Sequence, residues 1–315
     1  MTLSVPLRHR LAAICAAVAA AAVLAVPALA GQPTGEERDS GEQQRSSDQR
    51  SPTSGGPKLT VMSYNIHHGR GVDGQLDLKR IADVVEEEDT DVVALQEVDN
   101  HFGERSEFRD QAAELAEELD MEFAYGANLD FDPPEPGAPR RQYGNAILSK
   151  HPIRESDNHP LPRTSERNEQ RGLLEALIKV RGVPFRLYNT HLQHNSAADR
   201  ALQVDAILEE TKEEAGPHAL LGDLNARPEA PELARLFTNF RDAWAVAGEG
   251  DGFTISSSRP YARIDYALTS PDVGIEAARV PETLASDHLP VVAELRLRRP
   301  APGHGRGDDR GDRKD

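Results

Sequence analysis

Short apolar runs alternate with segments of helical periodicity between residues 58 and 298. The helical spacing first occurs at Leu78, Ile81 and Val84, between two runs of strand length, so the chain opens as strand, helix, strand. Further helices are predicted over about residues 107–119 and 196–214. The predicted strands are 59–66, 91–98, 144–149, 173–180, 185–192, 218–224, 263–269 and 290–297. Because strands outnumber helices, we expect mixed sheets covered by helices rather than an all-parallel open sheet.

The ends of the chain differ from this block in composition. Residues 31–57 contain no aliphatic or aromatic residue, and residues 299–315 are dominated by Pro, Gly and charged residues. Such segments cannot bury enough apolar surface to offset the entropy of ordering, so we expect a disordered linker and a disordered tail. Residues 58–298 are expected to form one domain.

The first 30 residues have the organisation of a secretory signal peptide. Arg8 and Arg10 precede an apolar run rich in Ala, Val and Leu, and residues 28–30 (ALA) match a cleavage site. We therefore expect a secreted, extracellular monomer with no stable membrane insertion after cleavage. The alternative is an N-terminal membrane anchor, because the run is close to the shortest length that spans a bilayer.

Charge and cysteine usage narrow the chemistry. The 315 residues carry 36 Lys and Arg against 53 Asp and Glu, a net charge of -17. An acidic protein repels polyanions at long range, which disfavours nucleic acid as a partner, although a local groove can still be positive. The single cysteine, Cys15, lies in the predicted signal peptide, so any metal would be bound through oxygen or imidazole.

Six polar clusters adjoin the predicted strands. Each alone is typical of a turn, a cap or a solvated strand end. Strand ends share one rim in a mixed sheet, so their joint occurrence predicts a single site there. Hard oxygen ligands with two histidines suit Mg²⁺, Mn²⁺ or Ca²⁺ and hydrolysis of a phosphoester by water. The clusters are Asn65, Gln96-Glu97, Asn189-Thr190-His191, Asp223 with Asn225, Asp265, and Ser286-Asp287-His288.

In this order and spacing, the clusters resemble the endonuclease/exonuclease/phosphatase superfamily, which includes deoxyribonuclease type I-like enzymes and sphingomyelinases. The resemblance implies an α/β (α+β) fold: a four-layer α/β sandwich with two mixed β-sheets packed face to face and helices outside. The motifs that carry it are MSYNIHHG (62–69), LQEV (95–98), YGNAILSK (143–150), YNTHL (188–192), GDLNA (222–226), RIDYAL (263–268) and SDHLPV (286–291).

The resemblance also implies how the carboxylates and amides act. Asn65 and Glu97 would bind the principal metal, Mg²⁺ or Mn²⁺, with Asp287 nearby. Asp223 would position or activate the attacking water. Asn225 would hold the phosphate or a second metal.

Two histidines receive roles in the same way. His191 would contact the phosphate or act as a general acid. His288 would contact the scissile phosphate or transfer a proton, oriented by Asp265, since a carboxylate behind an imidazole fixes its tautomer and favours its charged form. His67 and His68, which follow the first motif, would tune the rim or serve the structure only.

The function predicted from the sequence is that of a secreted, divalent-metal-dependent phosphoesterase, and more specifically a phosphodiesterase. Its alternatives are a nuclease acting on extracellular DNA or RNA and a sphingomyelinase-like phospholipid hydrolase. A non-catalytic extracellular binding module is the alternative outside the enzymes. Five arginines offer local positive charge for a phosphate: Arg140, Arg141, Arg163, Arg167 and Arg171.

Overall fold

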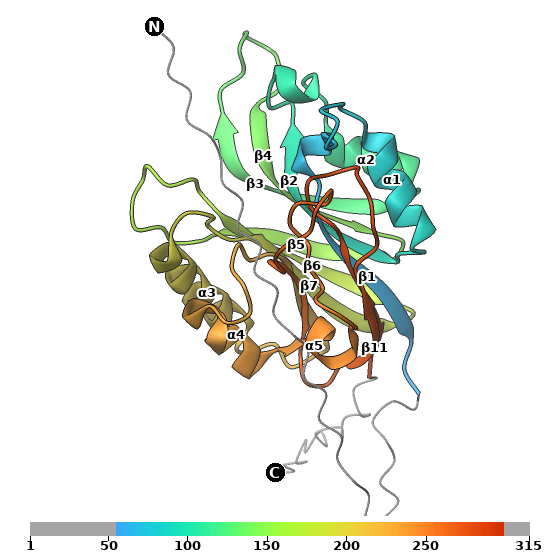
Figure 1. Cartoon of the computed structure of the whole chain (residues 1–315). Helices are drawn as coiled ribbons and strands as arrows, with labels where there is room; N and C mark the ends of the chain where they lie inside the picture. Colours follow the sequence, from blue (N-terminus) through green and yellow to red (C-terminus); the bar gives the residue numbers. More distant parts are fainter. Residues whose placement is uncertain (1–54, 299–315) are drawn as a thin grey trace, which may run out of the picture. The chain divides into compact units, whose positions relative to one another are not determined.

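A computed structural model describes residues 55–298. The predicted signal peptide, most of the linker and the tail lie outside the described residues. Within them, the strands form two six-stranded sheets (Figure 1). The first sheet has the order β11 (Gly274–Arg279), β12 (Val291–Arg296), β1 (Lys58–Asn65), β2 (Val92–Asn100), β4 (Arg141–Ser149), β3 (Glu122–Phe131). The second has the order β5 (Ile153–Pro160), β6 (Gly172–Val180), β7 (Val183–His191), β8 (His218–Asp223), β10 (Asp265–Thr269), β9 (Arg241–Asp242).

Both sheets are mixed. In the first, β1 is parallel to β2 and antiparallel to β12; in the second, β7 is parallel to β8 and antiparallel to β6. The remaining paired neighbours are antiparallel. Strands from both ends of the domain therefore meet in the first sheet, where β1 lies beside β12.

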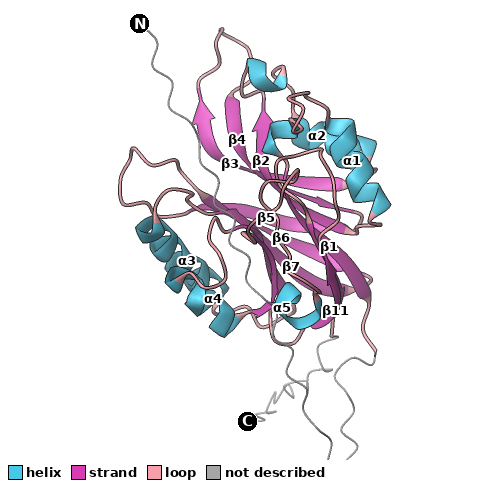
Figure 2. Ribbon diagram, in the orientation of Figure 1, coloured by secondary structure: helices cyan, strands magenta, loops and turns pink. Residues whose placement is uncertain are grey.

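Helices cover the outer face of each sheet (Figure 2). The helix α1 (Leu78–Glu87) and the helix α2 (Gln111–Glu118) pack on the first sheet. The helices α3 (Ala197–Thr211) and α4 (Ala234–Asn239) pack on the second. The short helix α5 (Ala243–Ala247) lies beside β10 and β11. Three 3-10 turns complete the elements: η1 (His67–Gly69), η2 (Glu104–Ser106) and η3 (Pro231–Leu233).

The period-two alternation of β1 shows how the layers arise. Leu59 and Val61 belong to the core between the two sheets, whereas Met62 and Tyr64 belong to the core between the first sheet and its helices. All four side chains are at most 1% exposed. A strand buried on both faces in this way requires helices outside the sheets, and the predicted four-layer sandwich is confirmed.

Side-chain caps mark where the main helices begin. Asp77 accepts a hydrogen bond from the backbone N–H of Lys79 at the start of α1, and Ser196 accepts one from Asp199 at the start of α3. Each such cap stabilises a helix by about 1 kcal/mol. The second predicted helix begins only at Gln111 rather than at about residue 107, because Asp110 is its N-cap.

The predicted strands correspond to β1, β2, β4, β6, β7, β8, β10 and β12. The strands β3, β5, β9 and β11 were not predicted. In β5 every residue is at least partly exposed, and every residue of β11 is partly exposed, so neither carries the buried apolar alternation that identifies a strand. Within residues 55–298, no helix is both long and apolar enough to cross a membrane.

Candidate active site

The polar side chains of the site lie on the same faces of the two sheets as the apolar side chains that form the core between the sheets. Along β8, Ala219 and Leu221 lie in the core between the sheets, and Asp223 follows two residues later. Along β7, Leu187 occupies that core and His191 lies four residues further on. Because side chains of a strand alternate between faces, both polar groups point into the same layer as the core. The layer between the sheets is thus apolar over most of its length and polar at one edge.

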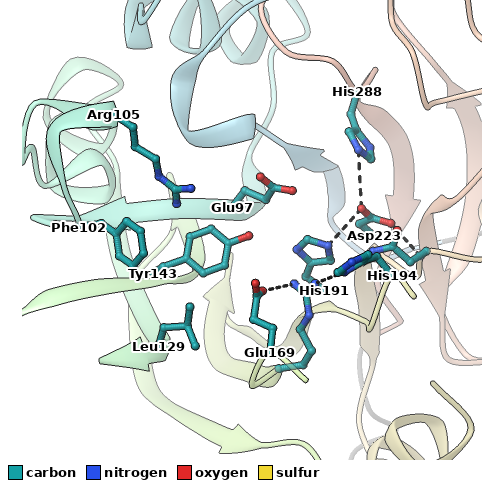
Figure 3. Close-up of a pocket in the computed structure, with 12 residues that line it drawn as sticks. Glu97, Phe102, Arg105, Leu129, Tyr143, Glu169, His191, His194, Asp223 and His288 are labelled. Atoms are coloured by element: carbon teal, nitrogen blue, oxygen red, sulfur yellow. Dashed lines mark hydrogen bonds and ion pairs between the residues drawn. The ribbon is translucent and has the colours of Figure 1, made fainter. Parts of the chain in front are cut away.

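Asp223 is the hub of this polar edge (Figure 3). Its Oδ2 accepts a hydrogen bond of 3.2 Å from Nδ2 of Asn65, and it lies 3.5 Å from Nε2 of His191 and 3.8 Å from Nε2 of His288. Its Oδ1 accepts a 2.8 Å hydrogen bond from the backbone N–H of Asn225. The carboxylate is 1% exposed, so its position is fixed by these four neighbours.

Burial raises the pKa of Asp223 to about 7, and repulsion by the nearby charge of Asp265 adds to the rise. The positive ring of His288 acts in the opposite direction. A carboxylate whose pKa lies near neutrality can exchange a proton with water at physiological pH, which is what a general base requires.

His288 is held by a carboxylate behind it. Its Nδ1 donates a 2.9 Å hydrogen bond to Oδ2 of Asp265, which is fully buried. Burial acts to lower the pKa of His288, but the charge of Asp265, this hydrogen bond and the charge of Asp223 outweigh it and raise the pKa to about 10. The ring is therefore a cation at neutral pH, and its Nε2 faces Asp223.

His191 has the opposite protonation. It is 4% exposed, and burial, with the positive charges of Arg171 and His288, lowers its pKa well below the usual value. The ring is neutral at physiological pH. The two imidazoles beside Asp223 thus differ in charge, because one has a buried carboxylate behind it and the other has an arginine nearby.

A β-bulge positions Glu97. The pairing of β2 with β4 shifts between Leu95 and Val98, so one extra residue is inserted in β2. Glu97 itself has a φ of 58°, and its Oε1 accepts a 3.1 Å hydrogen bond from Nδ2 of Asn65. Bulges often redirect a side chain beside an active site. Here the bulge brings Glu97 to the pocket that also contains Asp223.

Asn65 joins these groups at the end of β1. Its Nδ2 donates to both Glu97 and Asp223, and its Oδ1 accepts a hydrogen bond from the backbone N–H of His67. Its own carbonyl accepts a 2.7 Å hydrogen bond from Ser286. The first sheet and the loop before β12 are therefore linked at the residue that links the two carboxylates.

A buried amide pair bridges the two sheets beneath the site. Asn189 of β7 donates 2.8 Å hydrogen bonds to the carbonyls of Leu95 and Ala146 in the first sheet and accepts one from Gln96. Both amides are fully buried. The sequence placed Gln96 and Asn189 in polar clusters without a role, and the structure shows that they dock one sheet on the other.

Close packing of β8 on β7 brings Asp223 to this position. Gly222 has a φ of 154°, and a Cβ added there would lie 2.0 Å from the carbonyl oxygen of Thr190. Only glycine allows this approach. The glycine of the GDLNA motif therefore allows the close strand approach that places the aspartate of the same motif in the site.

The structure brings seven of the eight predicted site residues together and places the eighth, Asp287, at the rim. The side chain of Asp287 is 46% exposed, and its Oδ1 lies 3.7 Å from Nδ1 of His67. Asn225 lines the pocket beside Asp223, but its Nδ2 is already engaged with the carbonyl of Leu192. The seven residues are Asn65, Glu97, His191, Asp223, Asn225, Asp265 and His288.

His67 and His68, for which the sequence left open a role at the rim or a purely structural one, lie beside Glu97. Their side chains and that of Glu97 offer ligand atoms that lie within 4.8 Å of one another. Asp223, Asp265 and His288 form a second such group. Carboxylate oxygens and imidazole nitrogens are the donors that divalent ions such as Mn²⁺ use in proteins, so the residues present fit a divalent ion.

The pocket in front of these groups has a volume of about 320 Å³ and contains residues that the sequence did not identify. Arg105 stacks on Phe102 with its guanidinium carbon 4.4 Å from the ring centroid, and it pairs with the buried carboxylate of Asp99. Arg171 pairs with Glu169 at 3.0 Å. Only Arg171 of the five arginines noted above lines the pocket. The other lining residues not identified from the sequence are Leu129, Tyr143 and His194.

The fold and this site together define an α/β-sandwich hydrolase of phosphoesters. A model of the Endonuclease/Exonuclease/phosphatase family matches residues 62–288. The chain belongs to that family, whose members are hydrolases acting on phosphoester bonds.

Individual relatives agree with this assignment. A crystal structure described as an endonuclease/exonuclease/phosphatase from Beutenbergia cavernae is 30% identical with a TM-score of 0.65, covering 76% of this chain and 72% of that one. Protein YbhP of Escherichia coli K12 is 26% identical over 256 residues, covering 75% of this chain and 96% of YbhP. Protein cwh43 of Schizosaccharomyces pombe is 31% identical over 168 residues, which are 52% of this chain but only 16% of cwh43.

Proposed function

We propose that this chain is a divalent-metal-dependent phosphodiesterase that hydrolyses its substrate by attack of water on phosphorus, which breaks one P–O ester bond and releases the alcohol. The observation that carries the proposal is the placement of Asp223 between a neutral imidazole, His191, and a cationic imidazole, His288, on one wall of a pocket that also contains Glu97. A base, a cation and a candidate metal ligand then face one bound phosphate.

Each group has a role that follows from its protonation. Asp223 accepts the proton of the attacking water, because its pKa lies near neutrality. His288, kept charged by Asp265, donates a hydrogen bond to a phosphoryl oxygen and stabilises the negative charge that develops there. His191 is neutral, so it contacts the phosphate as a hydrogen-bond donor rather than as the acid of the resting enzyme.

Glu97 would hold the metal through its carboxylate and Asn65 through Oδ1, with Asp287 nearby at the rim. When bound, the ion would neutralise charge on the phosphoryl oxygens. Asn65 also fixes the separation of Glu97 from Asp223 by donating to both carboxylates. Loss of Asn65 would therefore disturb the metal ligand and the base together.

The charges of the pocket favour a diester over a monoester. Arg105 is paired with Asp99, and Arg171 is paired with Glu169, so a carboxylate already offsets the charge of each guanidinium. A diester carries one negative charge on its phosphate, whereas a monoester near neutral pH carries about two. The wall formed by Phe102 and Tyr143 can contact an organic substituent of the ester.

Chelator-reversible hydrolysis tests the proposal. Full-length protein would be assayed with bis-p-nitrophenyl phosphate, p-nitrophenyl phosphate, plasmid DNA, RNA, sphingomyelin and inositol phosphates, before and after EDTA and with Mg²⁺ or Mn²⁺ restored. We expect diester hydrolysis that EDTA abolishes, and loss of activity in Asp223→Asn. A folded protein inactive on every substrate would favour the binding module, and activity only on DNA or RNA would favour the nuclease.

We also propose that the protein is exported and cleaved before Gly31. The support is the order of features in residues 1–30: a basic segment, an apolar run and the ALA cleavage pattern. Mass spectrometry of the protein from its native host would find an N-terminus at Gly31, and retention of Met1 would favour the membrane anchor.

A further inference from the structure

The imidazoles of His67 and His68 adjoin the carboxylate of Glu97, which the proposed function makes a metal ligand. Each of the three side chains offers one ligand atom, and these atoms lie within 4.8 Å of one another. The two histidines follow β1 in the turn η1, and Glu97 comes from the bulge in the neighbouring strand β2. Two segments separated by about thirty positions in sequence therefore converge on one small volume.

The two rings are available to bind a metal. Nδ1 of His67 lies 3.2 Å from the carbonyl of Arg70 and 3.7 Å from Oδ1 of Asp287. A proton on Nδ1 would be donated to the carbonyl of Arg70, which leaves Nε2 with its lone pair. Metal-binding histidines characteristically donate their other ring N–H to a carbonyl or carboxylate in this way.

His68 is the more deeply placed of the pair. It is 7% exposed, and among residues 55–298 its Nδ1 has no hydrogen-bond partner. Burial and the positive charge of Arg105 also disfavour the protonated ring. A buried imidazole that lacks a partner for a ring nitrogen has no evident role in holding the fold through that atom.

All three candidate ligands have a left-handed backbone conformation. His67 has a φ of 45°, His68 a φ of 44° and Glu97 a φ of 58°, in the left-handed region that costs a non-glycine residue about 1–2 kcal/mol. The carbonyl of His68 is fixed by a 2.7 Å hydrogen bond from Gln111. The ring centroids of the two histidines are 4.5 Å apart, close enough for both to reach one ion.

We infer that His67 and His68 are ligands, together with Glu97, of a divalent transition-metal ion, so that this site prefers Mn²⁺ over Mg²⁺. The inference rests on the proposed function for the role of Glu97 alone. Mg²⁺ takes nearly all its ligands from oxygen, whereas Mn²⁺ also accepts imidazole nitrogen. Two imidazoles beside one carboxylate therefore select the softer ion.

The test measures metal binding directly. Full-length protein would be titrated with Mn²⁺ while free Mn²⁺ is followed by electron paramagnetic resonance, and pulsed measurements on the bound ion would detect coupling to imidazole nitrogen. The variants are His67→Asn and His68→Asn, because asparagine tolerates the left-handed backbone. His151→Asn is the matched control: this imidazole lies 3.8 Å from the carboxylate of Asp91, outside the pocket.

We expect each site variant to weaken Mn²⁺ binding by at least about tenfold, since changes even to outer partners of a metal ligand cost about 10–100-fold. The control should bind Mn²⁺ as the parent does, and Mg²⁺ affinity, measured by competition, should change less than Mn²⁺ affinity. His67 is partly exposed, so its variant remains informative if His68→Asn fails to fold.

Two results would overturn the inference: nitrogen coupling absent from bound Mn²⁺, or parental Mn²⁺ affinity in folded His67→Asn. Its failure is distinguishable from failure of the proposed function. If folded His67→Asn hydrolyses the diester with unchanged metal affinity, the histidines are not ligands and the phosphodiesterase proposal stands. If the protein binds Mn²⁺ through imidazole but hydrolyses no ester, the histidines are ligands and the proposed function is wrong.

Discussion

Replacing Asp265 with asparagine should change the pH dependence of catalysis more than it changes the fold. The carboxylate lies 2.9 Å behind Nδ1 of His288, whose pKa it helps to raise from 6.5 to about 10. That difference corresponds to about 5 kcal/mol in favour of the charged ring, at about 1.4 kcal/mol per pKa unit. It is the net effect of all neighbours rather than the share of Asp265, because burial opposes the charge while Asp223 and Asp287 also favour it.

The amide of Asp265→Asn carries no charge, so the pKa of His288 falls toward its usual value of 6.5, although Asp223 and Asp287 still favour the charged ring. A pKa of 6.5 would leave about 3% of the rings protonated at pH 8, so kcat falls by up to about 30-fold from protonation alone. Loss of the ring's orientation can extend the fall to about 10⁴-fold, as it does in Ser-His-Asp sites. Acidification toward pH 5.5 restores the proton, and removal of the Asp265 charge also lowers the pKa of Asp223, so the base stays ionised.

The assay is kcat for bis-p-nitrophenyl phosphate from pH 5 to 9 with saturating Mn²⁺, beside thermal unfolding. Asp242→Asn is the matched control, because Asp242 is a mostly buried carboxylate paired with Arg263 at 2.7 Å and lies beside Leu268, at the other end of β10. It should lose stability and keep kcat. A folded Asp265→Asn protein with the parental kcat at pH 8 and the parental pH profile would refute the reasoning.

Three further predictions follow from other parts of the structure. Asn189→Ala leaves the buried carbonyls of Leu95 and Ala146 without their donor, and urea unfolding should show a loss of about 2–5 kcal/mol in the free energy of unfolding; a loss below about 1 kcal/mol would contradict the bridging role. The pKa of His68 is lowered to about 3 by burial and by Arg105 and His67, so the unfolded state binds the extra proton and stability falls as the pH drops below 6.5. His68→Asn should reduce that slope between pH 6.5 and 5 by up to about 1.4 kcal/mol per pH unit, and an unchanged slope in metal-free unfolding would show that this ring does not titrate differently on folding. With a net charge of -17, hydrolysis of a small diester should be nearly insensitive to salt, whereas a steep fall in activity between low and physiological salt would identify a polyanionic substrate.

Much of the fold was predictable because the core strands are buried on both faces and read as apolar runs. The site residues in β7, β8 and β10 were predictable for a related reason, since each directly adjoins such a run. Asp223 and His191 continue the alternation of their strands, so their convergence follows once the strands are neighbours. The predicted roles of these residues are what the proposed assays test.

The parts that the sequence did not predict depend on contacts distant along the chain. Nothing local identifies the bulge at Glu97, which is defined by the pairing of β2 with β4. Arg105 reaches the pocket because it stacks on Phe102 and pairs with Asp99, and a charged residue in a turn has no pattern of its own. The strand β11 has only partly exposed side chains and exists through its pairing with β12.

The division of the site between two sheets, joined by Asn189, has a practical consequence for split-protein design. A break between β4 and β5, after Ser149, would leave Asn65 and Glu97 on one fragment and the base Asp223 on the other. Neither fragment could hydrolyse an ester, and turnover would return only when β1 pairs with β12 again and the sheets dock. Fused to two interacting partners, the fragments would report association of those partners through an enzymatic signal.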